Sequence, residues 1–215
     1  MDANILDGLR TMLEGIKKED AMKKILVVED NEAAYPAIKE AFSGFGTVEI
    51  VADLSGFYKA VIVGKPNLVV TDMFFPYKTG SGKRELGLEL GKEIEKAISR
   101  SEERSGGPNG NTRNAREGLA EWMGSQDEAD QPLGLEVVTI CEGRDIPVVV
   151  ASNLNHHASK FEGVVRLLGE RRYSFYEAKG KKEIIFEGSE RSEEIADKGS
   201  LHFWENLVKW LKSRQ

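Results

Sequence analysis

Charged and polar residues follow several apolar runs of this chain, at the points where those runs end. Glu29 and Asp30 follow one run, Asp72 follows another, and Ser152 and Lys179 follow two more. Carboxylates that converge on one point repel each other, but they are tolerated around a hard divalent cation such as Mg²⁺, which takes oxygen ligands. A lysine opposite them would complete a cradle for a phosphoryl group, and a serine hydroxyl could donate to one of its oxygens. These residue types indicate phosphoryl chemistry around a carboxylate.

The apolar runs predict strands buried on both faces, because they lack the alternation of a half-exposed strand. Strands are expected over residues 23–30, 47–53, 67–72, 145–153 and 173–179. Helical patterns lie between them, and a closing amphipathic helix is expected over 201–215. The alternation predicts a doubly wound α/β fold with a five-stranded parallel sheet. Ligands of such sheets bind beyond the carboxyl ends of the strands, where the polar residues lie.

Two stretches depart from this alternation. Residues 77–132 are rich in Gly, Ser, Asn and charge, which predicts an insertion with one or two surface helices. Residues 1–22 carry apolar residues at helical spacing, which predicts an amphipathic helix that either docks a partner, forms a dimer or packs on the sheet. The main domain is expected over 23–215, interrupted by the insertion. Within it, residues 183–188 are a candidate extra edge strand, and Trp122 of the insertion is expected to contact the main domain or a partner.

The composition excludes several classes of protein. The 215 residues are 40% hydrophobic and 31% charged, with a net charge of -6. Direct binding to nucleic acid is not expected, because a phosphate backbone requires clustered Lys and Arg. The single cysteine, Cys141, fits a reducing compartment. The sequence shows no signal peptide and no apolar run of the ~20 residues that a membrane helix needs, so a cytoplasmic location is expected.

Four fragments, in this order, resemble the receiver domain of two-component response regulators. "ILVVED" is similar to the family's first strand with its acidic pair, and "LVVTDMFFP" to the strand that carries the phospho-accepting Asp. "IPVVVASN" is similar to the fourth strand with its Ser/Thr switch, and "YEAK" to the fifth strand with its aromatic residue and lysine. The resemblance covers about residues 23–76 and 133–179. It implies a flavodoxin-like receiver fold with a long insertion after the third strand.

The resemblance also implies roles for the acidic residues. Asp72 would be the phospho-accepting nucleophile. Asp30, Asp72 and Glu29 would hold Mg²⁺, together with the backbone carbonyl of Phe74. Asp72 could instead simply cap the turn that follows it, as Asp often does.

On the opposite side of the same site, Ser152 would bind a phosphoryl oxygen and act as the switch hydroxyl. Lys179 would pair with the phosphoryl group, and Tyr176 would be the mobile aromatic. Only the spacing from Tyr176 selects Lys179 over Lys181 and Lys182. Gly180 stands where the family usually has proline after the lysine, so the loop there is expected to differ.

The resemblance implies a stand-alone receiver protein of a phosphorelay, not an enzyme beyond self-catalysed phosphoryl transfer. It would take its phosphoryl group from a sensor histidine kinase or a phosphotransfer protein and signal by contact with a downstream protein target, as a monomer or a homodimer. One alternative is a pseudo-receiver that works without phosphorylation. Another is a Mg²⁺-dependent phosphohydrolase, which would need a second acid/base where Phe74 stands. The cognate kinase and the pathway do not follow from the sequence.

Overall fold

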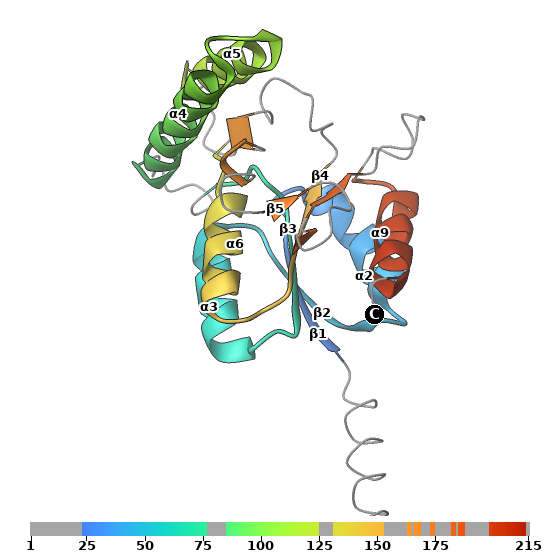
Figure 1. Ribbon diagram of the computed structural model, residues 1–215. Helices are drawn as coiled ribbons and strands as arrows, with labels where there is room; N and C mark the ends of the chain where they lie inside the picture. Colours follow the sequence, from blue (N-terminus) through green and yellow to red (C-terminus); the bar gives the residue numbers. More distant parts are fainter. Residues whose placement is uncertain are drawn as a thin grey trace, which may run out of the picture.

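A parallel sheet forms the centre of the protein (Figure 1). The computed structural model describes residues 23–76, 85–124, 131–152, 163–164, 166–168, 173–174, 182–183, 185–187 and 198–213. The sheet has the strand order β2-β1-β3-β4-β7. Its strands are β1 (Lys23–Val28), β2 (Gly46–Val51), β3 (Leu68–Thr71), β4 (Val148–Ser152) and β7 (Ile185–Glu187). The predicted α/β class with a parallel sheet is confirmed.

The central strands are buried on both faces, as their unbroken apolar sequences predict. Side chains of a strand point alternately to its two faces. Ile25 and Val27 of β1 therefore belong to one apolar core, and Leu26 and Val28 belong to the other. All four residues of β3 are buried.

Helices cover both faces of the sheet (Figure 1). On one face lie α2 (Tyr35–Phe42), which follows the 3-10 turn η1 (Glu32–Ala34), and α9 (Leu201–Ser213). On the other face lie α3 (Leu54–Gly64) and α6 (Gly134–Gly143). Among the described helices, none is both long and apolar enough to cross a membrane.

The insertion contains two helices, α4 (Glu85–Ser105) and α5 (Gly110–Gly124), which pack against each other. In Figure 1 they lie beyond the carboxyl ends of the strands. Trp122 of α5 is only 5% exposed and lines a small cavity together with Phe74. Glycine is required at position 91 of α4, because a Cβ there would lie 2.5 Å from the Trp122 ring.

The prediction for the fifth strand was wrong. Within the predicted strand over 173–179, the structure describes only β5 (Tyr173–Ser174), which pairs with β6 (Lys182–Glu183) in a separate two-stranded sheet. The place beside β4 belongs to β7, which lies within the candidate edge strand over 183–188. The reason is the pairing of Val150 with Ile185, a contact between distant residues that no local pattern reveals. The predicted N-terminal helix lies outside the described residues.

Candidate functional site

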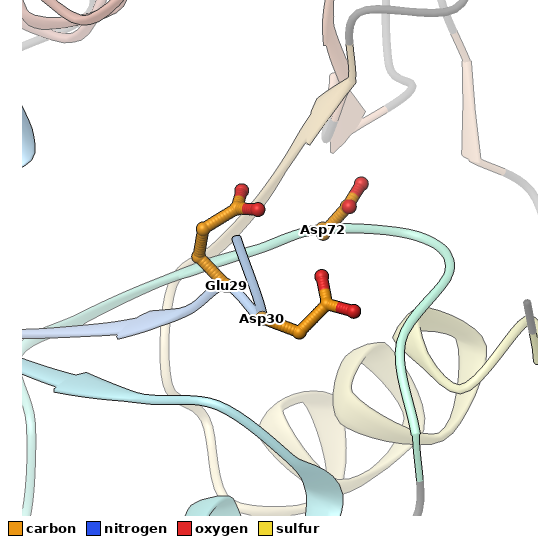
Figure 2. Close-up of side chains that lie close together, drawn as sticks. All are labelled: Glu29, Asp30 and Asp72. Atoms are coloured by element: carbon orange, nitrogen blue, oxygen red, sulfur yellow. The ribbon is translucent and has the colours of Figure 1, made fainter. Parts of the chain in front are cut away.

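Three carboxylates meet at the carboxyl edge of the sheet. Figure 2 shows Glu29 and Asp30 leaving the end of β1 and Asp72 leaving the chain just after β3. Parallel pairing aligns Val28 with Thr71, so the residues that follow each strand emerge at the same level. One carboxylate oxygen from each of the three residues lies within 4.8 Å of the others. The structure therefore brings together the three acidic residues that the sequence indicated.

The lysine at this site is Lys198, a residue that the sequence analysis did not consider. Its Nζ lies 2.5 Å from Oδ2 of Asp72 and 2.9 Å from Oε2 of Glu29. The side chains of Lys198 and Glu29 are 7% and 1% exposed, and that of Asp72 is 14% exposed. One buried ammonium thus bridges two of the three carboxylates, from the turn that precedes α9.

Burial and neighbouring charges shift the pKa values of Glu29 and Lys198 for different reasons. Burial raises the pKa of the Glu29 carboxyl to about 7; Lys198 lowers this pKa and Asp72 raises it, but desolvation is the largest effect. Burial alone would lower the pKa of the Lys198 ammonium, but the carboxylates of Asp72 and Glu29 outweigh it and raise that pKa. The ammonium is therefore held charged by two partners, while Glu29 shares it with Asp72 and gains too little to offset its own desolvation.

Backbone groups fix the orientation of Asp72. Its Oδ1 accepts a 2.7 Å hydrogen bond from the Met73 N–H, while its Oδ2 faces Lys198. The Gly134 N–H, at the start of α6, donates to the Met73 carbonyl at 3.0 Å. A Cβ at position 134 would lie 2.5 Å from the Asp72 carbonyl oxygen, so only glycine allows this close approach. The start of α6 is thus locked against the loop that carries Asp72.

The turn after β1 holds Glu29 in place. The Tyr35 hydroxyl donates to the Glu29 carbonyl at 3.0 Å, and the Asn31 N–H donates to Glu29 Oε1 at 3.2 Å. The Asn31 side chain in turn accepts from the Ala33 N–H and caps η1. Both oxygens of the buried Glu29 carboxyl therefore have hydrogen-bond donors, which buried carboxylates require.

The other residues selected from the sequence are only partly located. Ser152 is the last residue of β4 and pairs with Glu187 of β7. Lys179 and Tyr176 lie outside the described residues. Phe74 is half-buried and packs against an apolar core, and its carbonyl as a metal ligand stays a prediction. The sequence held no signal for Lys198, which follows no strand and lies in the turn before α9.

The donor set fits a hard divalent cation. Carboxylate oxygens from three residues converge, and Asp30 and Asp72 are both partly exposed, so that waters can complete a coordination shell. Mg²⁺ is usually held by one or two carboxylates, with waters and substrate oxygens at its other positions. Asp30 and Asp72 are the natural direct ligands, because both are partly exposed, whereas the Glu29 side chain is only 1% exposed.

Comparison of the chain with family models, with curated proteins and with solved structures found no match. The choice of function therefore depends on the chemistry of the site.

Proposed function

We propose that this chain is a receiver-type phosphoacceptor, which takes a phosphoryl group onto Asp72 with Mg²⁺ and signals by protein contact. The observation that carries the proposal is the buried Lys198 ammonium, which bridges Glu29 and Asp72 beside the Asp30 carboxylate. A structural ion pair needs one carboxylate, and a turn cap needs no lysine. A cation shared by two carboxylates at the carboxyl ends of parallel strands suits a site that binds a phosphoryl group.

The strand order supports the same proposal. The flavodoxin-like order of doubly wound sheets is 2-1-3-4-5, with its ligand site where β1 and β3 lie side by side. This chain has β1 and β3 adjacent, with β2 on one side and β4 followed by β7 on the other. The acidic residues follow β1 and β3. A receiver fold with an insertion after the third strand is therefore part of the proposal.

The chain's own groups account for most of the proposed reaction. An Asp72 oxygen attacks phosphorus, a new O–P bond forms, and the bond from phosphorus to the leaving atom breaks with its electron pair; that atom is a ring nitrogen of a phosphohistidine donor or the carboxyl oxygen of acetyl phosphate. Lys198 then pairs with the negative phosphoryl oxygens and also offsets the charge of Glu29. The Met73 N–H keeps the Asp72 carboxylate in one orientation. Bound Mg²⁺ would neutralise charge on the transferring group, held by Asp30 and Asp72.

The partners are proposed from the same chemistry. The phosphoryl donor would be a sensor histidine kinase or a phosphotransfer protein, and a downstream protein would bind the phosphorylated form. The α4–α5 hairpin lies at the site's end of the sheet (Figure 1), and its Trp122 lines a small cavity with Phe74, so incoming proteins would meet the hairpin. Hydrolase activity is disfavoured, because the half-buried apolar Phe74 stands where a second acid/base would be required.

Phosphorylation by a small donor tests the proposal. The protein is incubated with acetyl phosphate and Mg²⁺, and its intact mass is measured; a gain of about 80 Da is expected, the mass of one phosphoryl group. Asp72→Asn should abolish the gain. Asp145→Asn is the matched control, because Asp145 is exposed and precedes β4 at the opposite end of the sheet. Absence of any gain in the wild type would favour a pseudo-receiver.

A further inference from the structure

We infer that Trp204 is a positioning residue, which holds Lys198 at the acidic site through a hydrogen bond to the lysine's own backbone. This inference rests on the proposed function only for the role of Lys198 in phosphoryl transfer. The contact itself is a feature of the fold. The Trp204 Nε1–H donates to the Lys198 carbonyl oxygen at 2.6 Å, in a buried setting.

The beginning of α9 explains why this bond controls the lysine. Lys198, Gly199 and Ser200 form the turn before the helix, and Ser200 Oγ accepts from the Phe203 N–H at 3.3 Å, as an N-cap does. Trp204 follows in the first turn of α9, and its ring reaches back over the cap to the turn. The indole N–H therefore ties the Lys198 backbone to the helix through a buried contact.

The helix is in turn fixed against the sheet. Trp204 is 1% exposed and packs in the apolar core formed by α2, α9 and one face of the sheet. Its ring contacts Phe203 edge-on, with centroids 5.1 Å apart, and lies 6.5 Å from the Phe42 ring of α2. Because packing fixes the Trp204 ring, its hydrogen bond fixes the Lys198 carbonyl, and the position of the backbone sets where the ammonium lies.

Packing alone would explain a buried tryptophan, but not the polar contact. A buried indole N–H needs an acceptor, and many main-chain carbonyls could serve. Here the acceptor belongs to the one residue whose side chain bridges Glu29 and Asp72. Loss of the N–H leaves a buried carbonyl unsatisfied, and such a group is stabilised by moving toward water. The Lys198 backbone would then shift, and its ammonium would leave both carboxylates.

The test removes the N–H and keeps an aromatic ring, in the full-length protein. In Trp204→Phe, the reaction of each lysine with acetic anhydride is followed at pH 8 by peptide mass spectrometry. Lys209, exposed on the same helix, is the internal reference. The Lys198 rate relative to Lys209 should rise about tenfold, the effect of leaving one buried acceptor unpaired. The matched control is Trp210→Phe, which makes the same chemical change later in α9 and should leave the Lys198 rate unchanged.

A second readout separates positioning from general loss of stability. The rate of phosphorylation by acetyl phosphate should fall about tenfold in Trp204→Phe, while the Mg²⁺ Kd should not rise, because the metal ligands are carboxylates and departure of the ammonium from Asp72 removes a repelling charge. If the wild type is not phosphorylated, the proposed function fails, and the labelling rates still decide the role of Trp204.

Two outcomes would overturn the inference: an unchanged Lys198 labelling rate in folded Trp204→Phe, or an equal rise in Trp210→Phe. Should Trp204→Phe not fold, the isosteric 3-benzothienylalanine at position 204 removes only the N–H, and the same expectations apply to it.

Discussion

Replacement of Glu29 by Gln should remove a loss of stability that the metal-free wild type shows as pH rises through neutrality. Glu29 is 1% exposed, and burial raises its pKa from 4.5 to about 7. Between these values the unfolded chain has released the proton while the folded protein still holds it, so the stability contributed by this group falls as pH rises. Each pKa unit is worth 1.36 kcal/mol, which makes the total about 3 kcal/mol.

Gln cannot ionise, and the effect of its amide on the contacts with Lys198 and Asn31 is the same at every pH. The free energy of unfolding of Glu29→Gln, minus that of the wild type, should therefore rise by about 3 kcal/mol between pH 4.5 and pH 7.5. Other titrating groups are common to both proteins and cancel in this difference.

Urea unfolding in the presence of EDTA, at steps of half a pH unit, measures the difference in unfolding free energy between Glu29→Gln and the wild type. The control is Glu49→Gln, which removes an exposed carboxylate from β2. A difference that stays flat with pH in Glu29→Gln would refute the assignment of a raised pKa to this buried carboxyl. A similar rise in the Glu49→Gln control would assign the effect to net charge instead.

Two further substitutions test the rest of the site. Lys198→Met leaves Glu29 and Asp72 without their shared cation, and unfolding at pH 8 should show a loss of about 3–5 kcal/mol. The same variant should lose most of its Asp72 phosphorylation by acetyl phosphate, and a wild-type rate in it would remove Lys198 from the mechanism. Gly134→Ala places a Cβ 2.5 Å from the Asp72 carbonyl oxygen and should cost about 1–3 kcal/mol in urea unfolding. Gly143→Ala, at the open end of α6, is its control and should not be destabilised.

The acidic half of the site could be predicted from the sequence because its residues follow buried strands directly. Glu29 and Asp30 end one apolar run, and Asp72 ends another. In a parallel sheet the ends of neighbouring strands meet, so strand boundaries alone bring these side chains together. The same logic predicted the four strands β1 to β4 with small shifts at their ends.

The basic half could not be predicted in this way, because Lys198 follows no strand. It reaches Asp72 because α9 packs beside α2 and so delivers the preceding turn to the sheet edge. The prediction of the fifth strand was wrong for a related reason, since residues 173–179 and 185–187 are both short and rich in β-forming residues. Pairing with β4 decides between them, and that pairing is a long-range contact.

The composition of the insertion predicts its helices but not how they pack. Its polar sequence correctly indicated helices joined by Gly-rich turns, and α4 and α5 are these helices. The close packing of Gly91 against Trp122 needed the structure, because a glycine inside a helical pattern ordinarily counts against a helix. Here the missing side chain makes room for an aromatic ring.

Localisation of the phosphoryl group tests the central claim most directly. After reaction with acetyl phosphate and Mg²⁺, borohydride reduces an acyl phosphate to the alcohol, and tandem mass spectrometry of the digested protein locates the reduced residue. The account predicts homoserine at position 72 and unmodified Glu29 and Asp30. Reduction at another carboxylate, or none in a protein shown to bind Mg²⁺, would contradict it.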